Sequence, residues 1–287
     1  MIVGNEVIGA HAFLFGLAFL WTIFAVVQDL KTREVANWLT FSLIAFALTY
    51  RAFYAVSVRD YRFFLLGLLG FFVFVLASYG LYYGRVFAGG DAKLLMGYGA
   101  LLPYSQYGSL FFLSAGFLIL LLTLGAVYSL AYSAFVIVPR HRVLFWRAFR
   151  ERWNSYRSML IASVGLFVFF VVVSFYSLLG VPFVFLTIVP LTYLYTKAVE
   201  SCMIKRVGAS RLREGDWLVH DVRVGSILIK KSVHGLRGED IVVLRKADRA
   251  VVIKEGVPFV PAFLFALIVM VYVVVVLGAS LDVFFLF

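Results

Sequence analysis

Two aspartates beside apolar segments have the clearest potential for chemistry. Asp29 follows the apolar block 8–27 with only Gln28 between them, and Asp91 directly precedes the apolar stretch 92–103. A carboxylate at membrane depth is costly and by default marks a functional site. The other acids outside the polar segment 197–255 lie near the chain ends, among loop arginines or in the polar stretch after Asp29: Glu6, Glu34, Asp60, Glu151 and Asp282. The pair is therefore the first candidate for a catalytic site.

Two carboxylates that face each other across a helical bundle can share one proton, because two adjacent negative charges repel strongly in a poorly solvated site. The ionised member can then take a proton from water while the protonated member polarises a peptide carbonyl. Amide hydrolysis without a covalent intermediate requires this acid–base pair and needs no metal or cofactor. The chain has four scattered histidines and a single cysteine, Cys202, so we expect no metal site and no disulfide framework.

The segments that must position the aspartates are strongly apolar. Of the 287 residues, 63% are hydrophobic and 14% are charged, whereas a soluble domain is about 45–50% apolar and about 25% charged. Blocks at 8–27, 63–84, 110–138 and 259–285 reach the length of about 20 residues that a span requires. The sequence therefore predicts an integral membrane protein. No basic region precedes the first block, so we expect a retained helix rather than a cleaved signal.

The order of the predicted spans brings both aspartates to one membrane face. Spans are expected at 8–28, 37–58, 63–84, 92–103, 110–138, 159–179, 181–195 and from 259 onward. Basic loops beside spans usually mark the cytoplasmic side, and eight spans with both termini outside put every basic segment there. Since two of these segments are short for a span, we expect an all-α polytopic membrane bundle of about six to eight transmembrane helices.

The polar segment near the C-terminus predicts a small β-rich cytoplasmic domain. Short runs rich in β-branched residues are separated by breaks with Gly, Asp and Arg–Gly. The expected strands are at 217–224, 226–230, 240–244 and 250–253. The sequence thus divides into a transmembrane bundle with the aspartates at 1–196, this β-rich domain at 197–257 and a C-terminal transmembrane helix at 258–287.

The net charge of +11 comes mainly from two segments. Residues 140–157 hold six arginines against one acid, and residues 197–255 hold thirteen basic residues against eight acids. We interpret residues 140–157 as a loop between spans. Both segments are expected to be cytoplasmic, by the positive-inside rule, rather than nucleic-acid-binding surfaces. Contact with membrane lipids that have anionic headgroups is compatible with this charge.

Several residues near the aspartates are candidates for supporting or substrate-binding roles, each with a simpler structural explanation. Gly89 and Gly90 would let an extended substrate approach Asp91, or would form a flexible turn. Lys93 would favour the ionised form of Asp91, or extend to the lipid headgroups.

The connection after Asp29 holds three more candidates. Lys31 and Arg33 would orient substrate or hold Asp29 ionised, or would anchor the first span. Asn37 would contact substrate or, more simply, cap the second span. Farther along that span, Arg51 is expected near the outer end, with its side chain extending to the membrane surface.

Two stretches resemble a known family. Asp29-Leu-Lys-Thr-Arg-Glu-Val-Ala-Asn37 and, two spans later, Ala88-Gly-Gly-Asp-Ala-Lys93 resemble the type IV prepilin peptidases, which are membrane aspartic proteases with a GxGD signature. Ala88 stands where that signature has its first glycine. The stretches 214–217, 238–241 and 254–262 resemble the archaeal branch, the preflagellin (archaellin) peptidases.

The resemblance implies that Asp29 and Asp91 are the catalytic aspartates of an aspartic-type endopeptidase. Its implied substrates are precursor archaellins or type IV pilin-like proteins with a class III signal peptide, cut at the cytoplasmic face of the plasma membrane. Bacterial relatives often add a four-cysteine zinc element and methylate the new N-terminus. With one cysteine and no evident cofactor loop, this chain is expected to cleave without methylation, metal or cofactor.

Two other functions use the same aspartates. A signal-peptide-peptidase- or presenilin-like protease would cut inside the membrane, but such enzymes have both aspartates mid-span on consecutive helices, and here two spans intervene. A proton-coupled transporter would relay protons through the pair, but no acid lies at mid-bilayer and no inverted repeat is evident. A structural scaffold would leave the stretch 88–93 without a purpose.

Overall fold

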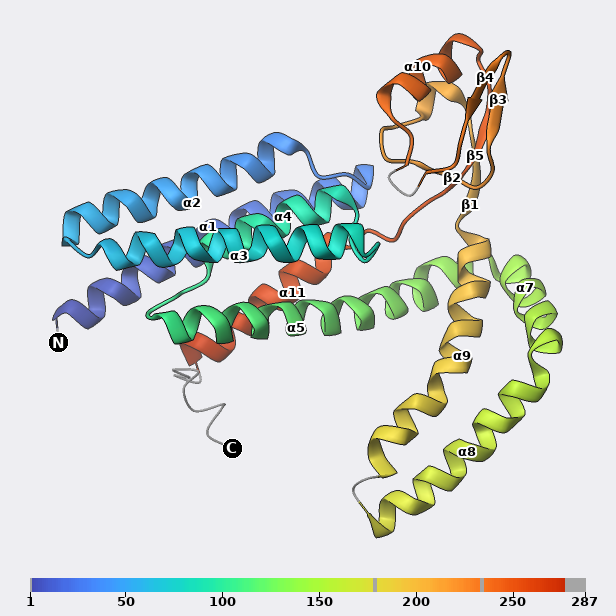
Figure 1. Cartoon of the computed structure of the whole chain (residues 1–287), viewed down its shortest axis with the longest axis horizontal. Helices are drawn as coiled ribbons and strands as arrows, with labels where there is room; N and C mark the ends of the chain where they lie inside the picture. Colours follow the sequence, from blue (N-terminus) through green and yellow to red (C-terminus); the bar gives the residue numbers. More distant parts are fainter. Residues whose placement is uncertain (1, 178–179, 233–234, 277–287) are drawn as a thin grey trace. The chain divides into compact units, whose positions relative to one another are not determined.

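The structure is a computed structural model that describes residues 2–177, 180–232 and 235–276 (Figure 1). The chain separates into two compact units, residues 1–130 with 257–287 and residues 131–256. Five helices are long and apolar enough to cross a membrane: Gly9–Thr32, Asn37–Val58, Tyr61–Tyr83, Tyr107–Arg140 and Arg157–Tyr176. A mainly helical, multi-pass membrane protein is thus supported, whereas a count of six to eight spans stays a prediction. The predicted division by membrane and cytoplasm also stays a prediction, because the two units are defined by packing alone.

The first unit is entirely helical in its described residues. Its helices are α1 (Ile2–Thr32), α2 (Asn37–Val58), α3 (Tyr61–Tyr83), α4 (Gly89–Leu101), most of α5 (Tyr107–Tyr132), α11 (Val260–Val271) and the π-helix η3 (Tyr272–Val276). The short helix α4 packs against α1, α2 and α3, and α11 packs against α1. Figure 1 shows α4 lying along α3 within this group.

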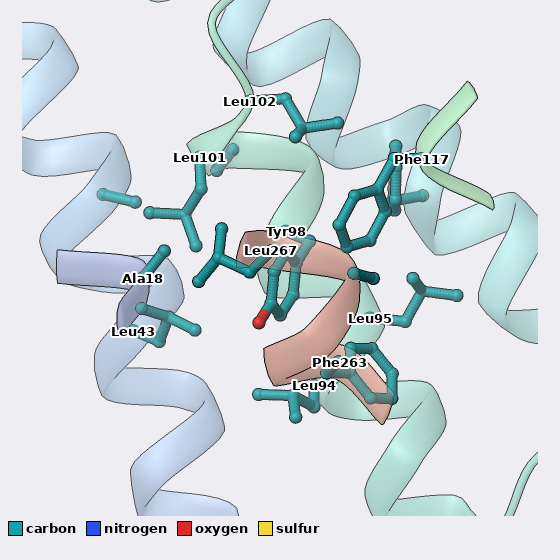
Figure 2. Close-up of a cluster of buried hydrophobic side chains, with 14 of the residues drawn as sticks. Ala18, Leu43, Leu94, Leu95, Tyr98, Leu101, Leu102, Phe117, Phe263 and Leu267 are labelled. Atoms are coloured by element: carbon teal, nitrogen blue, oxygen red, sulfur yellow. The ribbon is translucent and has the colours of Figure 1, made fainter. Parts of the chain in front are cut away.

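The core of the first unit forms around α4. Leu94, Leu95 and Tyr98 of α4 are completely buried, and Figure 2 shows them among side chains that include Phe117 of α5 and Phe263 of α11. The hydroxyl groups of Tyr98 and Thr22 are hydrogen-bonded at 2.6 Å. Backbone at membrane depth is tolerated in irregular or short elements where protein surrounds it. This enclosure explains how a helix of 13 residues fits among longer ones.

Arg51 corrects one prediction about this unit. Its side chain is completely buried and donates to the backbone oxygens of Ala100 at 2.7 Å, Phe63 at 2.8 Å and Leu102 at 2.6 Å. The last carbonyl groups of a helix have no intrahelical donor, and Arg51 satisfies two such groups at the end of α4. The expectation that Arg51 extends to the membrane surface is therefore wrong.

The second unit begins where the helix of α5 continues into η1 (Ser133–Ile137) and α6 (Val138–Arg140). It contains α7 (Arg142–Ser155), α8 (Arg157–Tyr176) and α9 (Gly180–Cys202). The basic segment 140–157, predicted as a loop, is thus mostly the helix α7. The reason is amphipathic packing, because Phe145 and Ala148 are buried with Ala198 and Val199 of α9 at the spacing of one helix face.

The rest of the second unit is a small mixed domain. It contains β1 (Ile204–Val207), the 3₁₀-helix η2 (Ala209–Arg211), β2 (Trp217–Leu218), β3 (Val222–Val224), β4 (Ile227–Ile229), α10 (Gly238–Lys246) and β5 (Val251–Lys254). The antiparallel strands form a sheet in the order β1-β5-β2 and a hairpin of β3 and β4. A small sheet region is present as predicted.

The strand predicted at 240–244 is wrong, because this segment lies in α10. Asp240 accepts the backbone N–H of Arg237 at 3.1 Å, which caps the start of the helix. Ile241 and Leu244 are buried at the i, i+3 spacing of one helix face. The β-branched residues that suggested a strand are outweighed by this cap and this spacing.

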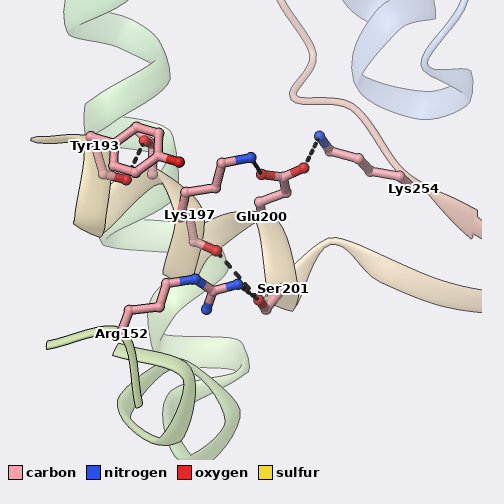
Figure 3. A network of polar contacts seen from close by, with 7 residues as sticks. Arg152, Tyr193, Lys197, Glu200, Ser201 and Lys254 are labelled. Atoms are coloured by element: carbon pink, nitrogen blue, oxygen red, sulfur yellow. Dashed lines mark hydrogen bonds and ion pairs between the residues drawn. The ribbon is translucent and has the colours of Figure 1, made fainter. Parts of the chain in front are cut away.

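A polar network joins α9 to β5 and to α7 within the second unit (Figure 3). The carboxylate of Glu200 accepts from Lys197 at 2.8 Å and from Lys254 at 2.7 Å. Arg152 of α7 donates to the hydroxyl oxygen of Ser201 at 3.1 Å. Burial raises the pKa of Glu200, but the hydrogen bonds from the two lysines outweigh it and hold that pKa below its usual range.

Candidate active site

Asp29 lies in the last turn of α1, which continues to Thr32, rather than in a polar connection after the span. Its side chain is 5% exposed, and Oδ2 accepts the backbone N–H of Val260 at 2.9 Å. The backbone of Phe259 also hydrogen-bonds to this carboxylate. Val260 is the first residue of α11. The carboxylate therefore lies at a helix N-terminus, where free N–H groups and the helix dipole favour a negative charge.

Asp91 lies in the first turn of α4, so residues 89 and 90 begin this helix rather than forming a loop before it. The side chain of Asp91 accepts the backbone N–H of Ala88, the N-cap residue, as a carboxylate does in a capping box. Ala88 has an extended backbone with φ −72°. An alanine therefore fits without strain where the signature has glycine.

Asp29 lies near enough to Asp91 for its charge to act on Asp91. Asp91 lies outside the five helices that could span a membrane. Burial, and then the negative charge of Asp29, raise the pKa of Asp91 to about 7. An interaction of this kind requires the carboxylates to be neighbours. Asp29 is buried and Asp91 is partly exposed. The two acids, distant in sequence, thus form one pair, and their role in catalysis stays a proposal.

The connection between α1 and α2 packs against the start of α4. Ala36 donates its backbone N–H to the side-chain oxygen of Gln28 at 3.1 Å, which closes the turn. A β-carbon built on Gly90 would lie 3.4 Å from the backbone nitrogen of Val35. Neither Gly89 nor Gly90 has a positive φ. At position 90 the glycine therefore serves close packing of backbone, rather than an unusual backbone conformation.

Asn37 and Lys93 form a contact that the sequence did not suggest. Lys93 donates through Nζ to Oδ1 of Asn37 at 2.7 Å, which links the start of α4 to the start of α2. The N-cap of α2 is Ala36, and Asn37 is the first residue of the helix. The prediction that Asn37 caps this helix is therefore wrong, and the amide instead binds the ammonium group.

The two basic residues after Asp29 differ in their surroundings. Arg33 lies near enough for its charge to act on Asp29, in a left-handed backbone conformation with φ 59°. Lys31 is exposed, and among the residues that the structure describes it makes no contact with either aspartate. Arg33 is thus the better candidate for keeping Asp29 ionised.

Sequence reasoning missed the start of α11 as part of the site. The ring centroids of Phe259 and Phe87 are 5.2 Å apart. Phe87 directly precedes the N-cap residue of α4. A β-carbon built on Gly125 would lie 2.3 Å from Phe259, so the glycine leaves room for this ring. The resemblance over 254–262 was the only signal for this segment. Across the described ranges, no group of three or more His, Cys, Asp or Glu could hold a metal ion.

A multi-pass helical membrane protein with a pair of carboxylates at its helix ends is the class that this fold and site define. Residues 16–139 match the type IV leader peptidase family, and this segment contains both aspartates. The match covers less than half of the chain, and within it the chain is similar to this family.

Two curated relatives agree with the family. The chain is 30% identical over 87 residues to a preflagellin peptidase of Methanococcus maripaludis, which is 30% of this chain and 37% of the relative. It is 32% identical over 81 residues to a preflagellin peptidase of Methanocaldococcus jannaschii, which is 28% of this chain and 34% of the relative. The chain thus spans about a third of the length of each. No solved structure matches significantly.

Proposed function

We propose that this protein is a membrane aspartic endopeptidase that removes the class III signal peptide from archaellin or type IV pilin-like precursors. The observation that carries the proposal is the pairing of Asp29 and Asp91, within a segment that matches the type IV leader peptidase family. The preflagellin peptidases among its relatives favour this substrate class.

In this proposal the two aspartates have different roles. Asp29 is the general base, because the backbone N–H groups of Val260 and Phe259 stabilise its ionised form. Asp91 is the general acid, because the pKa of about 7 leaves its carboxyl group half protonated at pH 7 and mostly protonated below it. Environments that give two carboxyl groups different pKa values are typical of acid–base pairs.

The reaction then needs only water and the two side chains. Asp29 takes a proton from a water molecule whose oxygen attacks the carbonyl carbon of the scissile peptide bond. Asp91 gives its proton to the carbonyl oxygen, which forms a neutral tetrahedral diol. The proton held by Asp29 passes to the amide nitrogen, the C–N bond breaks, and Asp91 regains a proton as the carboxyl group of the product forms.

The positions of the aspartates along their helices support cleavage near a membrane surface. Asp29 is in the last turn of α1 and Asp91 is in the first turn of α4. A precursor with a basic leader followed by an apolar helix has its cleavage site at such a depth. We place this surface at the cytoplasmic face of the plasma membrane, in a topology of eight spans in which residues 92–103 and 181–195 also cross. Two spans between the aspartates favour this function over a protease that cuts in mid-membrane.

The test is cleavage of a purified archaellin precursor by the full-length protein in membranes, followed as a shift in size. We expect Asp29→Asn and Asp91→Asn each to abolish cleavage, because each keeps the shape of the side chain and removes one acid–base group. Asp60→Asn is the matched control. Asp60 caps α3 by accepting the backbone N–H of Arg62, and asparagine caps equally well.

Correct folding of the variants is checked by thermal unfolding in detergent. Cleavage that survives in either variant would remove that aspartate from the mechanism. If both variants are inactive but a precursor with no apolar helix is cleaved equally well by the wild type, the proposed substrate class is wrong while the catalytic pair stands.

A further inference from the structure

The helix α7 exposes apolar and cationic side chains together. Val143 is 85% exposed and Trp146 is 53% exposed, while Arg142, Arg147 and Arg150 are also exposed. With 14 residues, α7 is too short to span a membrane. It connects the apolar helix that ends at Arg140 to the one that begins at Arg157. A short amphipathic helix between two spans lies at the membrane surface.

The charge around α7 is strongly one-sided. Residues 140–157 contain six arginines and one acid, Glu151. Tryptophan is enriched where a membrane meets water, and Trp146 and Trp153 are both partly exposed. A surface of this composition is complementary to a negatively charged lipid leaflet.

A pocket on this helix concentrates the positive charge. It has a volume of about 460 Å³ and is lined chiefly by Leu144, Arg147, Glu151, Arg152, Ser155 and Ser201. Its polar groups come from two helices, α7 and α9. Two guanidinium groups and two hydroxyl groups around one small space suit a phosphate group, which accepts several hydrogen bonds and is bound bidentately by arginine.

The two pocket arginines have unused capacity for such a ligand. Arg152 donates to the oxygen atoms of Ser201 at 3.1 Å and Ala148 at 3.3 Å, and a guanidinium has five N–H groups. Across the described ranges, Arg152 makes no ion pair with an acid. Arg147 pairs with Glu151 at 3.2 Å, but these side chains are 79% and 67% exposed. An exposed pair of this kind is weak and can yield to an anion.

We propose that this pocket binds the phosphate of a negatively charged phospholipid, with the lipid tails in the bilayer beside α8 and α9. The exposed apolar residues of α7 then enter the headgroup region, and the arginines bind the phosphate. This inference is independent of the proposed protease activity, because it uses no residue of the aspartate pair.

The test is native mass spectrometry of the full-length protein taken from micelles that contain equal amounts of phosphatidylglycerol and phosphatidylcholine. We expect the wild type to retain phosphatidylglycerol in preference to phosphatidylcholine. Replacing both pocket arginines, in Arg147→Gln with Arg152→Gln, lowers this preference about tenfold, since charge-assisted hydrogen bonds are lost. Glu151→Gln raises it, because the only acid in the pocket is neutralised.

The matched control is Arg142→Gln with Arg150→Gln, which removes the same charge from the same helix but not from the pocket. We expect it to change the preference by less than about twofold. Thermal unfolding in neutral lipid checks each variant. Should the pocket double variant fail to fold, Arg147→Gln alone replaces it, since its exposed side chain supports little of the structure.

Three results would overturn the proposal. Equal losses in the pocket and control variants would show general surface charge rather than a site. Equal retention of the two lipids by the wild type would show no headgroup preference. The third result combines two observations: millimolar inorganic phosphate displaces the retained lipid from the wild type, and the pocket variants retain that lipid as well as the wild type does. The lipid would then bind at an unrelated surface.

Discussion

Val260 donates its backbone N–H to Oδ2 of Asp29 at 2.9 Å, and this bond joins the first helix of the chain to its last described α-helix. The family match ends at residue 139, so this contact reaches beyond the matched segment. N–H groups at a helix N-terminus favour the ionised form of a carboxylate that accepts them and fix its orientation. The start of α11 therefore positions the proposed base.

This contact predicts a difference between two substitutions at one position. Val260→Pro removes the N–H group, and proline is tolerated at the first position of a helix. Val260→Ala keeps the N–H group and removes only side-chain atoms. We expect kcat for precursor cleavage to fall about tenfold or more in Val260→Pro, as expected when a hydrogen bond to a charge is lost, and less than about threefold in Val260→Ala.

The measurement is steady-state cleavage by both variants at matched folded fractions. Proline also disfavours the helical conformation of the preceding residue, here Phe259, so the folded fraction is set from thermal unfolding. Equal kcat values in the two variants would mean that the N–H group does not support the base.

The pair also predicts how cleavage depends on pH. Burial and then the charge of Asp29 raise the pKa of Asp91 to about 7, from about 4 in an unperturbed aspartate. Asp91 is therefore protonated below about pH 7 and loses its proton above it. We expect kcat/KM to be level just below pH 7 and to fall about tenfold per pH unit well above it. Initial rates between pH 6 and 9 check this, and a rate that rises over this range would assign the acid role elsewhere.

For Gly67 and Gly80 of α3 we expect different outcomes of the same substitution. A β-carbon on Gly67 would lie 2.2 Å from Cδ of Arg51, whereas none of the atoms around Gly80 lies within 4 Å. Arg51 cannot move aside without losing its three hydrogen bonds to carbonyl groups. We expect Gly67→Ala to lower the free energy of unfolding by about 1–3 kcal/mol and Gly80→Ala to leave it nearly unchanged. Thermal unfolding in detergent measures both, and similar midpoints would contradict the packing.

Glu200 predicts a dependence of stability on pH in the second unit. The bonds from Lys197 and Lys254 outweigh burial and hold the pKa of Glu200 below its usual range. A carboxyl group with a lowered pKa stabilises the fold above its unfolded pKa of about 4.3 and loses this effect as pH falls through its folded value. We expect Glu200→Gln to be less stable than wild type at pH 7, with the difference vanishing toward pH 3.

The control for this prediction is Glu151→Gln. Glu151 also pairs with a basic residue, but both side chains are mostly exposed, and such pairs contribute little. The unfolding midpoints of Glu151→Gln should therefore match those of the wild type at pH 7 and at pH 3. A destabilisation by Glu151→Gln as large as that by Glu200→Gln would contradict the role assigned to the Glu200 network.

The sequence predicted the long helices well because their apolar blocks are separated by charges. The second helix begins at Asn37 and ends at Val58, as predicted. The sequence predicted secondary structure less well where one local signal competed with another. Residues 241–243 are β-branched, yet the cap from Asp240 makes this segment helical. Arginine content suggested a loop at 140–157, yet Phe145 and Ala148 give α7 a buried face.

The candidate site could be predicted only in part. Asp29 and Asp91 are conspicuous, because acids are rare beside apolar segments. The contribution of Val260 is a backbone group, which no residue type reveals. The roles of Asn37 and Arg51 likewise depend on contacts across the fold, with Lys93 in one case and with Ala100 and Leu102 in the other. Such contacts exist only once the helices have packed.

The place of α11 in the chain has a consequence for biosynthesis. A ribosome releases α1 and α4 early, but it releases Val260 only after the whole of residues 131–256 has been made. Until then Asp29 lacks the donor that orients it in the finished fold. The proposed base is therefore oriented only once α11 has docked beside α1.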